Sequence, residues 1–529
     1  MAAVLPRSVP GGMPPAPAPT TEAPFESILS EACGAPSPAP PECFHDLGLD
    51  QIVQAAVASC KDHDLAGFFH ASLASEDAVA YRQEVMRELE RPEVMAAVRG
   101  FTGRLRTMRG QLPLATRSHN AHERDRWHLD AVQFYGEAIA TMQRELGSLA
   151  LHSRGLRRWR AHLGGYAGSP SFVRLMARAA QLQRDLAAVV YTVTIAGPDV
   201  MVRTYEGEPD YTAEVEHTFA KFRRSAAKDY LARLPATVGL NHIEAQVLDC
   251  VARLHPDLFA ALAAFRAEHG DFIDPQVERF DREVHFYIAW LDFIAPLRDA
   301  GLPFCYPRVS AGNKAVCARD AFDLALAHRL LARQQPVVGN DFTLHGEERV
   351  MVVTGPNQGG KTTFARMFGQ LHWLAALGCP VPAARARLFL FDRMFSHFER
   401  QEDIRNLRGK LHDDLVRMQR ILAQATPASV VVINEIFSST TLQDALFLGR
   451  EILQRLSKLD ALAVCVTFLD ELASFSPKVV SMVAAIDPAD PTARSFKLER
   501  RAADGLAHAL AIAEKYHVTG AWLKARIPP

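Results

Sequence analysis

The stretch Val350-Met351-Val352-Val353-Thr354-Gly355-Pro356-Asn357-Gln358-Gly359-Gly360-Lys361-Thr362-Thr363 decides the fold of this chain. An apolar, β-branched run leads directly into the pattern G-x-x-x-x-G-K-T, which is the spacing of a phosphate-binding P-loop. Apolar residues at helical spacing follow the motif, at Phe364, Phe368 and Leu371. This order of strand, loop and helix predicts a nucleoside triphosphate site. The alternative is a purely structural glycine turn.

The chemistry of this loop depends on glycine, lysine and a hydroxyl group. Glycines allow consecutive backbone N–H groups to turn towards phosphate oxygens at the positive end of the following helix. We expect Lys361 to reach the β- and γ-phosphates and to act in catalysis, and Thr362 to ligate Mg²⁺. The sequence therefore predicts ATP and Mg²⁺ as cofactors. The predicted nucleotide-binding residues are Gly355, Pro356, Asn357, Gln358, Gly359, Gly360, Lys361, Thr362 and Thr363.

Around the loop, buried strands alternate with helices. The expected strands are Val350–Thr354, Ser429–Ile433, Leu462–Thr467 and Val479–Ile486. Such alternation is typical of a mainly parallel sheet with helices on both faces. We therefore expect an α/β P-loop domain over residues 336–529.

A polar pair, Asn434-Glu435, ends the second of these strands. Hydrolysis needs a group in the Mg²⁺ shell and a group that orients or deprotonates water, besides the P-loop itself. Glu435 is the predicted catalytic residue that polarises the water, and Asn434 is predicted to contact Mg²⁺ through a water. A solvated strand-end pair is the alternative. The hydroxyl-rich turn 438–441 is expected to cap the next helix, and a contact to a second nucleotide across a dimer stays open.

Before this domain the sequence indicates a tail and a helical module. The Pro/Ala-rich residues 1–24 cannot bury a core and are predicted to be disordered. Residues 25–335 are predicted to be mainly helical, with Asp274-Pro275 as a helix start and a β-hairpin near 189–205. The hairpin could be a contact tip or a cap on the helical layer. Apolar stripes at helical spacing are Leu129, Val132, Gly136, Ile139, Met142 and Leu146, and Phe280, Val284, Tyr287, Ile288 and Leu291.

Composition narrows the class of protein. The 529 residues are 48% hydrophobic and 22% charged with a net charge of -1, as in ordinary globular proteins of several domains. This charge excludes a globally basic nucleic-acid binder but permits local basic patches. The eight scattered cysteines form no C-x-x-C pair, which favours free thiols in a reducing compartment. No stretch resembles a signal peptide or a membrane span, so we expect a cytoplasmic protein without a membrane partner.

Five motifs, in order, resemble the ATPase domain of the MutS family of DNA mismatch-repair proteins, a branch of the ABC ATPase class. The resemblance implies an ABC-type fold and, here, a homodimer formed through the ATPase domain. The motifs are Gly355–Thr363 (similar to GPN-x-GGK-[ST]-T), Leu377–Ala383 (G-x-x-VPA), Asp392–Phe395 (D-R-I-F), Asn434–Ile436 (D-E-I) and Val466–Leu472 (T-H-x-x-E-L).

Three positions depart from the family pattern. Asn434 replaces an acidic residue, which removes one negative charge beside a divalent ion. Phe468 stands in the place of the switch histidine, and a phenyl ring cannot donate a hydrogen bond to the γ-phosphate. The trans-acting Ser-Thr-Phe signature is not readable in Glu402–Leu415, where Arg408-Gly409-Lys410 is either a substitute phosphate contact or a solvated loop. We therefore expect slow hydrolysis, with ATP-driven dimer closure as the main output.

The helical module resembles MutS-related lever or core helices more weakly, at Asp46–Ile52 and Tyr81–Leu89. The resemblance implies a lever or clamp that grips DNA. We find no separate amino-terminal mismatch-reading domain before residue 44, so canonical mismatch recognition is not expected. The leading expectation is a nucleotide-switched dimer on DNA or DNA junctions, associated with the nucleoid if it binds DNA.

Local basic clusters could provide the DNA contact. Arginines beside aromatic residues suit phosphate binding and base stacking, although interleaved acids such as Glu123 and Asp125 equally fit a solvated helix face. The rival expectation is an ATP-dependent scaffold that engages protein partners. An ABC transporter subunit is disfavoured because L-S-G-G-Q is absent. The clusters are Arg104, Arg106, Arg109, Arg117, Arg124 and Arg126; Arg154, Arg157, Arg158 and Arg160 beside Trp159; and Arg203, Lys221, Phe222, Arg223, Arg224 and Lys228.

Overall fold

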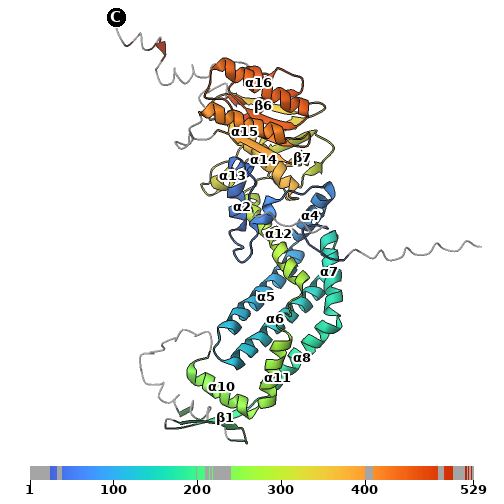
Figure 1. Cartoon of the computed structure of the whole chain (residues 1–529), viewed down its shortest axis with the longest axis vertical. Helices are drawn as coiled ribbons and strands as arrows, with labels where there is room; N and C mark the ends of the chain where they lie inside the picture. Colours follow the sequence, from blue (N-terminus) through green and yellow to red (C-terminus); the bar gives the residue numbers. More distant parts are fainter. Residues whose placement is uncertain are drawn as a thin grey trace, which may run out of the picture.

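The computed structural model describes residues 24–31, 39–197, 199–208, 240–399, 409–486 and 494–503, together with positions 214, 217, 218, 519, 520, 522 and 526. The expected tail up to residue 23, the basic residues 221–228 and the segment 402–408 lie outside the described residues. The molecule is elongated, with a mixed α/β lobe at one end and a helical arm that extends away from it (Figure 1).

Long helices build the arm. The helices α5 and α6 pack against each other along their length, and α7, α8 and α11 flank them. The helix α12 runs back towards the lobe (Figure 1). The bounds are α5 Pro92–Arg117, α6 Ala121–Ser148, α7 Arg154–Ala167, α8 Pro170–Ala187, α11 Pro256–Glu268 and α12 Pro275–Asp299. The expected helix start is confirmed, because the Asp274 side chain accepts hydrogen bonds from the N–H groups of Gln276 and Val277 at 2.9 and 3.1 Å.

A β-hairpin lies at the far end of the arm (Figure 1). Strands β1 (Tyr191–Ala196) and β2 (Asp199–Thr204) pair antiparallel, and β2 contacts α10 (His242–Leu254). The hairpin exposes large apolar side chains, including 43% of Val193 and 51% of Met201. The hairpin therefore exposes apolar surface while Val202 of β2 packs against the helical layer.

The lobe centres on a six-stranded sheet with the order β12-β11-β6-β10-β9-β8. All neighbouring strands pair in parallel except the edge strand β12. Helix α14 packs on one face, whereas α15 and α16 pack on the other, so the central strands are apolar throughout. The bounds are β6 Val350–Thr354, β8 Met394–Phe398, β9 Val430–Asn434, β10 Leu462–Val466, β11 Val479–Ile486, β12 Arg494–Arg500, α14 Lys361–Ala376, α15 Lys410–Gln424 and α16 Leu442–Leu459.

A second, four-stranded sheet has the order β3-β7-β4-β5. Its strands come from both sides of residue 336, since β3 and β4 precede this position and β5 and β7 follow it. The sheet therefore crosses the boundary that the sequence suggested, and it adds two strands to a region expected to be mainly helical. The bounds are β3 Arg308–Ser310, β4 Val316–Ala321, β5 Asn340–Leu344 and β7 Arg385–Phe389, with α13 (Leu324–Leu331) between β4 and β5.

Short amino-terminal helices pack on the P-loop helix α14. Gln370 Nε2 donates to Leu47 O at 2.8 Å, and Trp373 Nε1 donates to Phe69 O at 3.0 Å. A single apolar core runs from the arm into one face of the main sheet. Arm and lobe are therefore joined through α14. The remaining bounds are α1 Cys43–Leu47, α2 Leu49–Val57, α3 Ala66–His70, α4 Glu76–Leu89 and the 3₁₀ helix η1 Asp470–Ala473.

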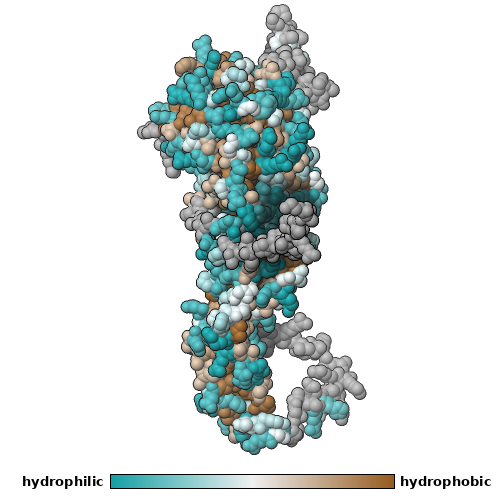
Figure 2. All heavy atoms as spheres, turned by 90° about the vertical axis from the view of Figure 1, so that its right-hand side faces the viewer, coloured by the Kyte–Doolittle hydropathy of each residue, from teal (hydrophilic) through white to brown (hydrophobic). Residues whose placement is uncertain are grey.

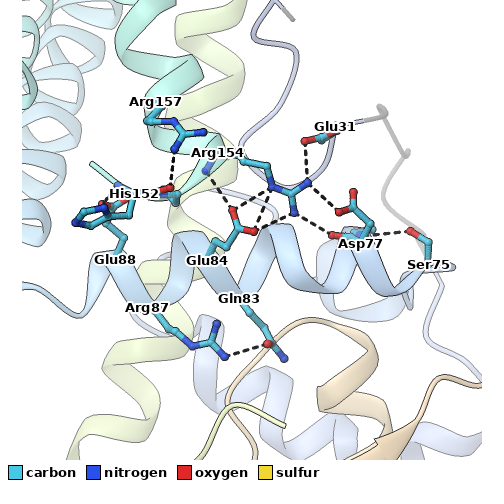
Figure 3. A network of polar contacts seen from close by, with 12 residues as sticks. Glu31, Ser75, Asp77, Gln83, Glu84, Arg87, Glu88, His152, Arg154 and Arg157 are labelled. Carbon is cyan, nitrogen blue, oxygen red and sulfur yellow. Dashed lines mark hydrogen bonds and ion pairs between the residues drawn. The ribbon is translucent and has the colours of Figure 1, made fainter. Parts of the chain in front are cut away.

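An ion-pair network joins α7 of the arm to α4 and to the amino-terminal segment around Glu31 (Figure 3). Arg154, at the start of α7, contacts the carboxylates of Glu84, Asp77 and Glu31 at 3.1, 2.9 and 3.2 Å. The hydrogen bond with Glu84 is the main reason that the pKa of Arg154 is raised above its ordinary value. Beside it, Glu88 accepts the N–H of His152 at 2.6 Å. The network fixes where α7 begins relative to α4.

Candidate nucleotide-binding site

The loop between β6 and α14 adopts a conformation that requires glycine. Gly355 and Gly360 have φ angles of 120° and 92°. A Cβ atom on Gly355 would lie 2.8 Å from the Cβ of Ala484 on the neighbouring strand β11. Only glycine allows the backbone to turn this tightly against β11, in the conformation that a phosphate-binding loop requires.

Lys361 is buried at the start of α14, with 4% of its surface exposed. Its Nζ donates to the carbonyl oxygens of Gly355 and Pro356 at 2.8 and 3.0 Å. The same Nζ lies 4.2 Å from the ring centroid of Phe468, which is a cation–π contact. The ammonium group is therefore held by two loop carbonyls and an aromatic ring, at the position from which it would reach phosphates.

The structure brings Thr362 and Asn434 together, although 72 residues separate them. Thr362 Oγ1 donates to Asn434 Oδ1 at 2.9 Å, because β9 ends beside the first turn of α14. A hydroxyl oxygen can ligate Mg²⁺ directly, and an amide carbonyl oxygen can accept a hydrogen bond from a Mg²⁺-bound water. These two residues fit a Mg²⁺ site and would supply its oxygen contacts from the protein.

Glu435 follows Asn434 with a φ of 55°, and its N–H donates to Val466 O at 3.0 Å. This turn fixes the carboxylate at the mouth of the site. Partial burial raises the pKa of Glu435, and the positive charge of Lys361 opposes that rise. A carboxylate with a raised pKa is a better proton acceptor, which suits a residue that activates water.

A cavity of about 570 Å³ adjoins the loop. Its polar end is formed by loop residues 357–363 and Glu435. Its remaining lining is mostly apolar, with Asp323, Gln335 and Asn340 as polar members, and includes side chains from α13, which lies before the expected domain boundary. A polar end for phosphates and an apolar end for a base fit a nucleoside triphosphate. The unpredicted lining residues are Asp323, Leu326, Leu330, Gln335, Pro336, Val337, Val338, Asn340 and Phe496.

The family comparison decides the class of this site. Residues 351–517 match the family model described as MutS domain V. The P-loop segment of this chain is MutS-related. Two proteins with the description DNA mismatch repair protein MutS, from two strains of Chloroflexus aurantiacus, are each 27% identical over 185 residues. The match covers 35% of this chain and 19% of each relative, so it spans about a fifth of the MutS relatives.

Domain V of MutS is a P-loop ATPase domain, and MutS proteins are ATPases that use ATP with Mg²⁺. The matched region begins inside β6 and includes the whole loop, Asn434, Glu435 and Phe468. The helical arm lies outside it. The comparison therefore supports a MutS-related P-loop domain and leaves the role of the arm to the structure.

Polar side chains of the segments around Lys410 and around residues 438–441 already make contacts within the chain. The Lys410 ammonium contacts Glu399, and Ser438 Oγ donates to Glu399 Oε1 at 3.0 Å. Thr441 caps α16 by accepting the N–H of Asp444, which confirms the predicted cap. Lys410 would have to leave Glu399 to contact a phosphate of a partner subunit.

Most described arginines of the expected DNA-binding clusters are engaged inside the arm. Arg109 contacts the buried carboxylate of Asp281, and Arg158 contacts Glu31 at 3.1 Å. Trp159 is fully buried and stacks on Phe280 with ring centroids 3.9 Å apart, so it cannot stack on a base. These contacts tie Arg109, Arg158 and Trp159 to the arm, whereas Arg117 and Arg203 are exposed and the basic residues 221–228 lie outside the described residues.

Another group of possible metal ligands lies where the arm meets the lobe. His63, Asp281 and His285 have ligand atoms within 4.8 Å of one another. Burial and the nearby charges of His285 and Arg109 lower the pKa of His63 to about 4. Because Arg109 already pairs with Asp281, the group is explained as a buried polar network.

No helix in the described residues is long and apolar enough to cross a membrane.

Proposed function

We propose that this chain is an ATP-binding, slowly hydrolysing MutS-related ATPase that works as a nucleotide-switched dimer on DNA or DNA junctions. One observation carries the proposal. The P-loop lysine and Thr362 line one cavity, and Thr362 Oγ1 donates to the Asn434 amide oxygen, all within the segment that matches MutS domain V. Glu435 beside them supplies the general base.

Slow turnover follows from two side chains. Asn434 offers Mg²⁺ a neutral oxygen, so the site attracts the ion less than a carboxylate would. Phe468 gives the γ-phosphate no hydrogen-bond donor and instead contacts Lys361. Bound ATP has to replace the contacts of Lys361 with Gly355, Pro356 and Phe468. ATP, when bound with Mg²⁺, supplies the phosphoryl group that is transferred to water.

The arm would act as a lever driven by α14. Trp373 of α14 donates to the carbonyl of Phe69, and the Phe69 ring lies 4.7 Å from the ring of Phe286 on α12. Phosphate binding at the first turn of α14 would shift this helix against α12. Packed, contiguous side chains of this kind can carry energetic coupling between two sites.

Dimerisation is supported by apolar side chains around the site. Leu442 and Phe447 on α16 are 62% and 71% exposed, and Phe468 and Phe496 are 50% and 46% exposed. Exposed apolar side chains of this size are common at protein interfaces. Closure of two lobes over ATP would cover them.

The hairpin at the end of the arm favours a second candidate function, in which the arm engages a protein. Its exposed residues include Tyr191, Val193, Val200 and Met201, and apolar surface of this kind suits a protein partner better than phosphates. In this case the ATP switch would be the same and the partner would differ.

The decisive experiment compares the wild-type chain with Glu435→Gln and Lys361→Ala. We expect Glu435→Gln to bind a fluorescent ATP analogue and to form dimers on sedimentation, while phosphate release falls roughly a hundredfold or more. Lys361→Ala should lose nucleotide binding. No ATP affinity in the wild type, or phosphate release unaffected by Glu435→Gln, would contradict the ATPase proposal.

Binding to duplex, branched and mismatched DNA, with and without ATP, separates the two candidates for the arm. A nucleotide-dependent affinity for one of these DNAs supports the first candidate. Absence of binding to all of them at low salt favours the protein partner.

A further inference from the structure

The four-stranded sheet carries arginines on one face. Arg308 of β3 is directly opposite Arg387 of β7, and Arg319 of β4 is directly opposite Arg385 of β7. Directly paired residues project to the same side of a sheet, as do residues two apart on one strand. All four arginines therefore lie on the same face.

The other face of this sheet is apolar and buried. Ala318, Phe342, Ala386 and Leu388 alternate with the arginine face and pack into the core. This alternation fixes the register of the strands. It requires polar residues on the outer face, but it does not require like charges opposite each other.

The arginines border a groove of about 660 Å³ between this sheet and β12. Five arginines and one aspartate, Asp341, are among the lining residues. The fifth arginine, Arg500, is paired with Glu348. Figure 2, which faces the side of the lobe where β7 lies in Figure 1, shows a hydrophilic hollow there.

Within the described part of the chain, the side chains of Arg308, Arg319 and Arg385 make no hydrogen bond or ion pair. Arg387 is oriented by a hydrogen bond from its Nε to Ala315 O at 2.8 Å, which leaves the end of its guanidinium group available. Like charges directly opposite each other destabilise a sheet. Two such pairs share β7, and no carboxylate in the described residues forms an ion pair with them.

We propose that this groove binds the phosphodiester backbone of duplex DNA. Guanidinium groups match phosphate oxygens in geometry as well as charge, and four exposed arginines on adjacent strands suit an extended polyanion. A bound backbone would neutralise the opposed pairs. The inference rests on the proposed DNA-binding function and adds a DNA contact on the lobe, distant from the hairpin.

The test uses the full chain and the double variant Arg319→Gln, Arg385→Gln, which removes one opposed pair. The anisotropy of a fluorescein-labelled duplex is measured between about 50 and 200 mM KCl. We expect the slope of log affinity against log salt to fall by about 2, with roughly a tenfold loss of affinity at low salt. The melting temperature should stay the same or rise, because a repulsive pair is removed.

The matched control is Arg420→Gln, Arg455→Gln, which removes two exposed positive charges from α15 and α16. It should change the slope less than the groove variant. Equal slopes for the two double variants, or a wild-type slope in the groove variant, would overturn the groove and leave DNA binding intact. Absence of duplex binding by the wild type would overturn both proposals.

A competition arm separates DNA from a small anion. Inorganic phosphate, added at constant ionic strength, should not displace the duplex. If it displaces the duplex from the wild type but not from the groove variant, the groove is a small-anion site and the proposal fails.

Discussion

At the scale of single residues, Lys361 has to exchange partners when a nucleotide binds. Its ammonium group is shared by the carbonyls of Gly355 and Pro356 and by the ring of Phe468. A cation–π contact at a half-exposed ring contributes about 0.5–1 kcal/mol. The ring of Phe468 therefore competes only weakly with phosphate for Lys361. Its larger effect is that a phenyl ring cannot donate a hydrogen bond to the γ-phosphate.

Replacing Phe468 with histidine should accelerate hydrolysis. The imidazole can donate a hydrogen bond to the γ-phosphate, and a single donor of this kind is worth roughly tenfold or more in kcat. Phosphate release under saturating ATP is the measurement. Phe468→Leu is the control, because it removes the ring without adding a donor, so its kcat should remain at the wild-type level. A histidine variant no faster than the leucine variant would refute this role.

Replacing Asn434 with aspartate should lower the Mg²⁺ concentration needed for half-maximal activity by about tenfold. The carboxylate would restore a negative charge beside Thr362, at the end of β9. A Mg²⁺ titration of phosphate release measures this. Gln424→Glu, an exposed position at the end of α15, adds the same charge elsewhere and should leave the titration unchanged.

The sequence is sufficient to propose the P-loop residues, because their spacing is itself the motif. It could not show that Phe468 covers Lys361, since this contact depends on β10 lying beside β6. Nor could it reveal the apolar end of the cavity, because Leu326 and Leu330 belong to a helix that precedes the motif. Spacing along the chain identifies the chemistry, whereas contacts between distant segments determine how it is adjusted.

At the scale of elements, α14 is enclosed on nearly every side. The sheet covers one side, and α1, α3 and α13 cover another. His372 is therefore fully buried, with its Nδ1 on the Phe368 carbonyl at 2.8 Å and its Nε2 without a partner in the described structure. Burial lowers the pKa of His372 to about 4.

This histidine should make the protein sensitive to acid. Its folded pKa is below the unfolded value of 6.5, so the neutral form stabilises the fold above pH 6.5 and this contribution is lost as the pH falls towards 4. At pH 5 the loss should be about 2 kcal/mol. Urea unfolding at pH 7 and pH 5 measures it, and His372→Leu should reduce the difference.

The control for this experiment is His412→Leu, which removes an exposed histidine on α15. Its stability difference between the two pH values should match that of the wild type. If His372→Leu also matches the wild type, another group is responsible for the acid sensitivity.

Strand patterns in the sequence were informative where a strand is fully buried. The stretches 350–354 and 462–466 are buried along their length and form β6 and β10. The strands β3 and β4 were missed because they are short and carry arginines, so no apolar run marks them. They are strands because β7, far along the chain, pairs with both.

At the scale of the whole molecule, the nucleotide site and the arm share one core. The link runs from Trp373 on α14 through Phe69 to Phe286 on α12. The helix α12 is continuous over 25 residues, so a displacement at its base is carried along the arm.

Replacing Trp373 with phenylalanine should weaken this coupling and leave ATP binding intact. The variant loses the hydrogen bond to the Phe69 carbonyl, at a stability cost of about 1–2 kcal/mol. Hydrogen exchange of α12, with and without ATP, is the measurement, and the ATP-dependent difference should shrink. Trp159→Phe alters a buried tryptophan within the arm and should preserve the ATP-dependent difference in exchange. An unchanged difference in Trp373→Phe would exclude this route.

The four-stranded sheet also determines how the protein can be divided. A fragment that starts at residue 336 would contain the complete P-loop motif but would lack both neighbours of β7, and β5 would lose β4. It would also expose the side of α14 that Leu47, Phe69 and Arg82 cover. Such a fragment should aggregate through its unpaired strand edges. The smallest autonomous unit around this P-loop therefore includes segments that a motif search would assign to the preceding helical module.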